Sequence, residues 1–145
     1  MLKFRRLVEQ DISIVAEMEK ETFSDPWSEQ SIRETSGQKQ AFITVAEQGD
    51  KVVGYCIIYY VMDEAEIARI AVANECRRLG VGQGLLEYTI GLCKELQITR
   101  MLLDVRESNV TARNFYIKNG FSEDGVRKNF YENPKEHAVL MSCGL

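Results

Sequence analysis

Hydrophobic and polar positions along the chain repeat with two periods, and each period predicts one kind of element. Alternating positions, or runs rich in β-branched and aromatic residues, predict strands over 2–8, 41–47, 51–62, 64–72, 100–107, 121–131 and 137–144. Apolar residues three and four positions apart predict helices over about 12–23, from Ser28 onward, over 85–97 and from Asn109 to Gly120. The predicted order is therefore β-α-α-β-β-β-α-β-α-β-β.

Residues that flank these helices are typical of helix ends. Asp11, Ser28 and Asn109 precede helices, and each has a side-chain oxygen that can accept a hydrogen bond from a first-turn N–H group. Gly120 follows a helix, where a left-handed glycine often ends one. We expect these residues to set the helix boundaries.

Two pieces of the pattern determine the type of sheet. The strand–helix–strand piece over 64–107 requires a parallel crossover, whereas the hairpin over 41–62 requires antiparallel pairing. We expect an α/β (α+β) fold, a mixed central sheet of about seven strands with four helices on both faces. The 145 residues show no internal repeat or linker, so we expect a single domain over 1–145.

The composition is that of a globular protein, with 45% hydrophobic and 28% charged residues. A net charge of −4 argues against nucleic-acid binding and suits a cationic partner, such as an amine or a basic polypeptide. The N-terminus has no signal-like apolar run, and the longest apolar stretch, 52–62, is too short to span a bilayer. We therefore expect neither a nucleic acid nor a membrane as partner.

The four cysteines are widely spaced without a C-x-x-C pair, and His137 is the only histidine. This pattern predicts no structural metal site. Four reduced thiols are typical of a reducing compartment, so we expect a cytoplasmic protein.

Residues 77–87, RRLGVGQGLLE, place three glycines on alternate positions between a strand and a helix. Backbone N–H groups at a helix N-terminus bind anions, and glycine lets a phosphate approach closely. Arg77 and Arg78 would add charge-assisted hydrogen bonds. The spacing is neither the G-x-G-x-x-G of dinucleotide sites nor the G-K-[ST] of P-loops. From the residues alone, the run is either another kind of phosphate site or only a tight connection.

The R-x-x-G-x-G in this run resembles the acetyl-coenzyme A pyrophosphate loop of the GNAT N-acetyltransferases. Four further segments are similar to the RimI-type bacterial ribosomal-protein-alanine N-acetyltransferases: FSDPWSE (23–29), EIARIAV (66–72), LDVRESNVTARNFYIKNGF (103–121) and RKNFY (127–131). The resemblance covers essentially the whole chain. It implies the GNAT fold and transfer of acetyl from acetyl-CoA, by direct attack, to the N-terminal α-amine of a protein. The implied acceptor is a ribosomal protein with an N-terminal alanine.

The resemblance also assigns residues to the cofactor. In this family the strand before the loop is splayed from its neighbour, so the backbone of Ile70, Ala71 and Val72 is expected to bind the pantetheine arm and polarise the thioester. The other implied cofactor contacts are Arg77, Arg78, Leu79, Gly80, Val81, Gly82, Gln83, Gly84, Asn109 and Tyr116. The pattern itself makes the side chains of Ile70 and Val72 core residues and Asn109 a helix cap.

Acetyl transfer needs an acid that protonates the departing thiolate. By resemblance, Tyr116 has this role and points at the sulfur of CoA. Its place on an apolar helix face with Ala112 and Phe115 also predicts an ordinary core residue. The residues alone leave both interpretations open.

The general base is a separate question. By resemblance, Asp104 takes the place of a family glutamate, but its side chain is one methylene shorter. A bridging water could make up the difference, or another group, such as Glu66 or Glu64, could act instead. Asp104 could also be purely structural, paired with Arg106 or a lysine.

The acceptor is expected, again by resemblance, between Trp27 on one side and Phe130 and Tyr131 on the other. The pattern alone makes Trp27 a hydrophobic staple with Ile32, and makes Phe130 and Tyr131 strand residues. Because the pyrophosphate loop contacts only the cofactor, two other functions stay open. One is acetylation of a small amine or a lysine side chain, and the other is CoA binding without catalysis.

Overall fold

A computed structural model describes residues 1–77 and 79–145, so the predicted cofactor contact at Arg78 lies outside the described residues. The strands are β1 (Leu2–Arg6), β2 (Ala41–Gln48), β3 (Lys51–Val61), β4 (Glu64–Val72), β5 (Arg100–Arg106), β6 (Ser122–Tyr131) and β7 (Glu136–Gly144). The helices are α1 (Ile12–Thr22), α2 (Glu29–Ser36), α3 (Val81–Glu95) and α4 (Val110–Lys118), with short 3₁₀ turns at Glu9–Asp11 and Asn74–Cys76. The predicted order of strands and α-helices is confirmed.

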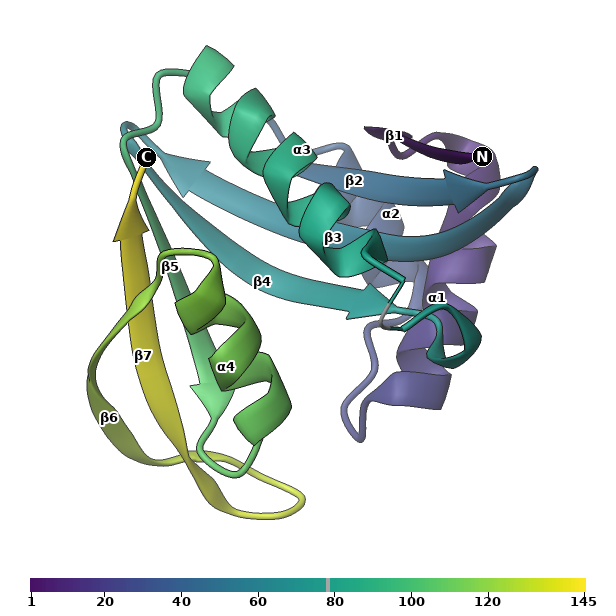
Figure 1. Ribbon diagram of the computed structural model, residues 1–145. Helices are drawn as coiled ribbons and strands as arrows, with labels where there is room; N and C mark the ends of the chain where they lie inside the picture. The colour runs from purple at the N-terminus through teal and green to yellow at the C-terminus, as the bar shows by residue number, and fades with distance from the viewer. Residues whose placement is uncertain (78) are drawn as a thin grey trace.

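The seven strands form one sheet in the order β1-β2-β3-β4-β5-β7-β6. Neighbouring strands are antiparallel except for β4 and β5, which are parallel and joined through α3. Helices α3 and α4 lie on one face of the sheet, and α1 and α2 lie on the other (Figure 1). The mixed sheet covered by helices on both faces is therefore confirmed.

The parallel pair β4 and β5 stays together over only part of its length. Pairing joins Glu64–Ile67 to Arg100–Leu103, but β4 continues to Val72 and β5 to Arg106. Figure 1 shows the two strands diverging from that point. The splay divides the sheet into one part built on β1–β4 and another built on β5–β7.

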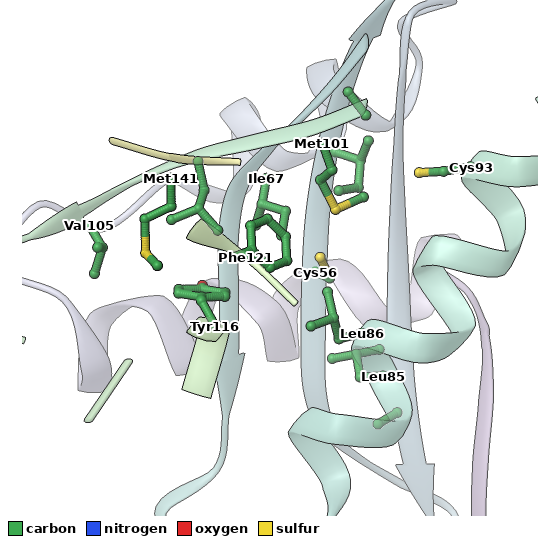
Figure 2. Packing of buried hydrophobic residues seen from close by; sticks show 14 of the residues in the cluster. Cys56, Ile67, Leu85, Leu86, Cys93, Met101, Val105, Tyr116, Phe121 and Met141 are labelled. Atoms are coloured by element: carbon green, nitrogen blue, oxygen red, sulfur yellow. The ribbon is translucent and has the colours of Figure 1, made fainter. Parts of the chain in front are cut away.

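Two apolar clusters hold the helices against the sheet. The first lies under α3 and α4, and Figure 2 shows the ring of Tyr116 among its residues, near Met141 and Phe121. The second cluster packs α1 and α2 against β2, β3 and β4 only. Strand β5 buries alternate residues toward the first cluster, while the residues between them, Asp104 among them, are half-buried on the opposite face.

Helix α3 begins at Val81, four residues earlier than the predicted 85. The glycines had argued against helix there, because glycine is a poor helix former. Tertiary packing prevails, since Val81 is buried and Gly84 lies against the ring of Phe4. The apolar spacing over 85–97 predicts Leu96 on the buried face of this helix together with Leu85, Leu86 and Cys93. That prediction is wrong, because Leu96 follows the last helical residue and is 38% exposed.

The helix-end predictions are confirmed except at Asp11. Ser28 Oγ accepts the N–H of Ser31 at 3.0 Å, and the Asn109 side chain accepts the N–H of Ala112 at 3.1 Å. Gly120 has a φ of +94° directly after α4.

Asp11 precedes α1 but makes no side-chain bond to the first turn of that helix. Its carboxylate instead accepts the N–H of Val8 at 2.8 Å and two hydrogen bonds from Arg5, at 2.7 and 3.1 Å. The predicted cap is wrong because an arginine on β1 competes for the same oxygens.

Candidate active site

The splay leaves the end of β4 with only one strand partner. On one side, Ile70, Ala71 and Val72 pair with Cys56, Tyr55 and Gly54 of β3. On the other side, strand pairing within the described residues ends at Ile67. Backbone polar groups on that side have no strand partner, and such N–H and C=O groups can pair with a ligand. The side chains of Ile70 and Val72 pack on the first cluster, as predicted.

The glycine run begins beside this free edge. Gly80 adopts a left-handed conformation with φ +81° and precedes α3 without capping it by a side chain. The first helical hydrogen bond runs from the N–H of Gly84 to the carbonyl of Gly80, at 3.0 Å. The preceding N–H groups of the first turn have no partner within the helix, which is the arrangement that binds anions.

The glycines of the run have different surroundings. A Cβ on Gly82 would lie 3.6 Å from the ring of Phe115 and 3.7 Å from Val72, so this glycine joins α3 to the end of β4 and to α4. A Cβ on Gly84 would overlap the ring of Phe4, one atom of which would lie 2.9 Å away. Gly84, which we predicted to contact the cofactor, thus has a packing role against β1.

Arginine contributes to the same region. Arg77 is exposed, and its Nε donates to the carbonyl of Val72 at 3.2 Å. Its guanidinium therefore lies against the end of β4. Leu79 is 64% exposed and packs on neither cluster.

Tyr116 enters the site from α4 and is only 6% exposed. Its ring makes edge-on contacts with Phe115 and Phe121, at centroid distances of 5.4 and 5.5 Å. Burial raises the pKa of Tyr116, and Cys56 and Tyr131 act in the same direction, so the phenol keeps its proton in the neutral range. The core interpretation of the ring is correct, and it does not exclude an acid role for the hydroxyl.

Asp104 lies on the other face of the sheet, half-buried on β5. Its alternative role as an ion-pair partner is wrong, since no salt bridge among the described residues includes it and Arg106 pairs with Glu136 at 3.3 Å. Glu66, on β4, pairs in register with Leu102, two residues before Asp104, so the two carboxylates share a face. Burial and the charge of Asp104 raise the pKa of Glu66, while Arg127 opposes this.

Glu64 is a poorer candidate for the base, because it pairs with Arg100 at 3.4 Å near the start of the strand.

Tyr131 is the last residue of β6 and is half-buried. Burial raises its pKa to about 12, with a further contribution from the charge of Asp104. Its ring lies under the guanidinium of Arg106, 4.5 Å from the centroid. Arg106 also donates to the carbonyls of Pro134 and Glu132, at 2.9 and 2.8 Å, so the β6–β7 hairpin is tied to the end of β5.

The hairpin holds one further predicted residue and one that the sequence did not explain. Phe130 is 42% exposed, and the guanidinium of Arg127 lies 4.9 Å from its ring centroid. His137, the only histidine, accepts the N–H of Asn129 on Nδ1 at 2.9 Å, and Asn129 has a φ of +53°. It shapes the turn that presents Phe130.

The opposite wall is the loop between α1 and α2. The ring of Trp27 lies 6.3 Å from that of Tyr59, and both border a groove of about 490 Å³ that runs along α2 to Gln38. The charge of Arg69 lowers the pKa of Tyr131, and that of Asp25 raises it.

Sequence reasoning missed Glu19, Tyr55 and Arg69, which form a buried polar group behind this loop. The sequence held one signal of it. Glu19 occupies the apolar face of α1 together with Ile12, Val15 and Ala16, where a charged residue needs a buried partner.

Over residues 1–77 and 79–145, no cluster of three or more His, Cys, Asp or Glu side chains has the arrangement of a metal site. In the same part of the chain, no helix has the length and apolarity to cross a membrane. All four cysteines are free thiols.

Comparison with known proteins defines the class. Residues 12–121 match the model of the acetyltransferase (GNAT) family, so the chain belongs to that family.

Particular relatives match along most of their length. A [ribosomal protein bS18]-alanine N-acetyltransferase of Haemophilus influenzae is 34% identical over 138 residues, covering 93% of each chain. A Bacillus subtilis protein to which the same activity is attributed is 38% identical over 133 residues, covering 91% of this chain and 88% of its own. The crystal structure of the ribosomal-protein-S18-alanine N-acetyltransferase from Escherichia coli superposes with a TM-score of 0.91 at 28% identity, covering 99% and 94% of the chains.

Proposed function

We propose that the protein transfers acetyl from acetyl-CoA to the N-terminal α-amine of a ribosomal protein that begins with alanine. One observation carries the choice of acceptor: relatives that are 34% and 38% identical along about nine-tenths of this chain act, or are held to act, on the N-terminal alanine of bS18. Within this proposal the whole chain, 1–145, is one acetyltransferase domain that works in the cytoplasm.

On the donor side, we assign the pantetheine arm and the thioester to the free edge of β4 at Ile70, Ala71 and Val72. The pyrophosphate lies at the N-terminus of α3, over the N–H groups that follow Gly80. Two observations support this placement: strand pairing ends at Ile67, and the first-turn N–H groups lack helical partners. Arg77 supplies charge at the same point.

The chemistry uses both faces of the sheet at the point where β4 and β5 diverge. The amine nitrogen forms a bond to the thioester carbon, and the carbon–sulfur bond breaks. The departing thiolate takes a proton from the Tyr116 hydroxyl, and solvent then reprotonates the tyrosine. The proton of the amine passes to the carboxylate of Asp104. Tyr116 reaches the reaction from the first-cluster face and Asp104 from the opposite face, which suits groups that act on opposite ends of the reacting atoms.

A polypeptide acceptor fits the site better than a small amine. The groove beside Trp27 continues along α2, which gives room for residues beyond the first. Carboxylates at Glu66 and Asp104 on this face favour a cationic amine.

The test is a panel of peptides incubated with acetyl-CoA, followed by release of free thiol. We expect turnover with a peptide that begins with alanine and none with the same peptide blocked at its N-terminus. Turnover only with blocked, lysine-containing peptides or small amines would contradict the α-amine assignment. Tight binding of CoA without turnover of any amine would identify a binding module and refute catalysis.

A further inference from the structure

Glu19 is a charged residue with no exposed surface, and the proposed reaction does not use it. It lies on α1 and contacts the loop that carries Trp27 as well as the strand that carries the donor site. We infer that Glu19 and Arg69 are positioning residues that hold Trp27 in place for the acceptor. This inference rests on the proposed function, because it takes the Trp27 loop as an acceptor wall.

Both oxygens of Glu19 are occupied. Oε1 accepts the backbone N–H of Trp27 at 2.9 Å and Nε of Arg69 at 3.2 Å. Oε2 accepts a hydrogen bond from the hydroxyl of Tyr55 on β3. The carboxylate therefore fixes the backbone of the loop at Trp27 itself.

Arg69 holds the other half of the loop. Its guanidinium stacks on the ring of Phe23 at 3.9 Å from the centroid. Nη2 donates to the carbonyl of Asp25 at 2.7 Å and to the carboxylate of Asp25 at 3.2 Å. Three of the five residues over 23–27 are thus held by the Glu19–Arg69 pair.

The position of Arg69 on β4 gives the network its functional meaning. Arg69 follows Ile67, the last β4 residue paired with β5, by two positions and directly precedes Ile70. The acceptor wall is therefore anchored to the same strand that presents the thioester. A shift of this loop would move Trp27 relative to the reacting atoms.

A purely stabilising role explains the network less well. Burying an ion pair costs desolvation energy, and apolar residues of similar size often stabilise a fold as much or more. What an ion pair with several directed hydrogen bonds adds is geometry. Here the directed contacts of the pair all fix the position of one loop, residues 23–27. No buried side-chain polar atom among the described residues lacks a hydrogen-bond partner.

The experiment uses Glu19→Gln, which keeps the shape and removes the charge. We expect the KM for the peptide to rise about tenfold, with kcat and the Kd for acetyl-CoA changed by no more than about twofold, since only acceptor positioning is lost. Trp27 is the only tryptophan of the chain, so its emission spectrum and anisotropy report directly on the loop. Both should change in the variant.

The matched control is Asp11→Asn. Asp11 is also buried, at 5% exposure, and its carboxylate also accepts hydrogen bonds from an arginine and a backbone N–H. It precedes the first residue of α1, whereas Glu19 and the Trp27 loop lie at the other end of that helix. We expect it to lower the unfolding temperature without changing the KM for the peptide or the emission of Trp27. An equal rise of KM in both variants would mean that the Glu19 effect is general destabilisation, and would overturn the inference.

Asp25→Ala keeps the inference testable if Glu19→Gln fails to fold. Its side chain is 62% exposed, so folding should tolerate the change, while Arg69 loses one partner. We expect a rise of about threefold in the KM for the peptide and a smaller change in Trp27 anisotropy. An unchanged KM and an unchanged anisotropy in the folded variants would refute positioning. Absence of turnover in the wild type would refute the proposed function instead, and the anisotropy would still decide whether the network holds the loop.

Discussion

The proposed donor and acceptor sides of the splay differ in the sequence separation of the hydrogen bonds that hold each of them in shape. On the donor side, Arg77 donates a hydrogen bond to the carbonyl of Val72, five residues away. Asn109 caps α4 by accepting the N–H of Ala112, three residues away. On the acceptor side, the Glu19–Arg69 bond spans 50 residues, and Arg106 reaches the carbonyl of Glu132 across 26.

Under the proposed function, this difference corresponds to the ligand of each side. Backbone groups of one strand end and one helix start form the proposed donor side, and such groups suit a ligand that never changes. Side chains from the α1–α2 loop, β4 and the β6–β7 hairpin form the proposed acceptor side. Those side chains can be altered one at a time, so we expect acceptor choice to change more readily than cofactor choice.

Tyr116 belongs to the junction of the two sides, and its hydroxyl should give the largest effect. We expect Tyr116→Phe to lower kcat about 100-fold while the Kd for acetyl-CoA changes by less than about twofold, because only proton donation is lost. Steady-state kinetics and calorimetric titration measure the two quantities.

Thermal unfolding is the control for that variant. The Tyr116 hydroxyl has no hydrogen-bond partner among the described residues, so Phe should leave the unfolding temperature nearly unchanged. Parallel losses of kcat, cofactor affinity and stability would make Tyr116 a core residue only.

Substitutions at Gly84 and Gly82 distinguish a packing role from a cofactor-binding role on the donor side. Gly84→Ala forces a Cβ into the ring of Phe4 and should lower the free energy of unfolding by about 2 kcal/mol. Gly82→Ala meets only ordinary contacts with Phe115 and Val72, so it should leave stability unchanged or slightly higher. It should weaken acetyl-CoA binding, because the added methyl lies beside the end of β4.

Denaturant unfolding and acetyl-CoA titration check both variants, and Phe4→Leu combined with Gly84→Ala should recover part of the lost stability. If Gly84→Ala remained fully stable but lost cofactor affinity, Gly84 would be a binding residue, and the packing explanation would fail.

The same contrast in reach explains what the sequence could and could not predict. The order of strands and helices along the chain and the cap at Asn109 depend on neighbours within a few residues, and these predictions were confirmed. The cofactor contacts assigned to the glycine run stay a prediction. The start of α3 was missed because packing of Val81 and Gly84 outweighs the low helix propensity of glycine. The Asp11 cap was wrong because Arg5, on another element, takes its oxygens.

The Glu19–Arg69 network was missed for the same physical reason. Nothing within ten residues of Arg69 indicates that it pairs with α1, and only the acidic residue on an apolar helix face signals a buried partner. The roles of Tyr116 and Asp104 came from resemblance, since the local pattern makes Tyr116 a core residue, and its ring is indeed one.

The acceptor-side carboxylates give the smallest expected effect and the sharpest test of the base. We expect Asp104→Asn to lower the plateau value of kcat/KM, its pH-independent limit, by about tenfold. The reason is that the group that accepts the amine proton is gone. Glu66→Gln should lower it by about twofold, through weaker attraction of the cationic amine. Measured pH profiles of kcat/KM for the wild type and both variants distinguish the roles.

The direction of the pH shift identifies the alternative. Burial and the negative charge of Asp104 raise the pKa of Glu66, so removing that charge lowers it. If Glu66 were the base, Asp104→Asn would therefore move the acid limb of kcat/KM to lower pH and leave the plateau unchanged, while Glu66→Gln would lower the plateau. Unchanged plateaus in both variants would mean that neither carboxylate accepts the proton, and would leave water at the open face of β5 as the acceptor.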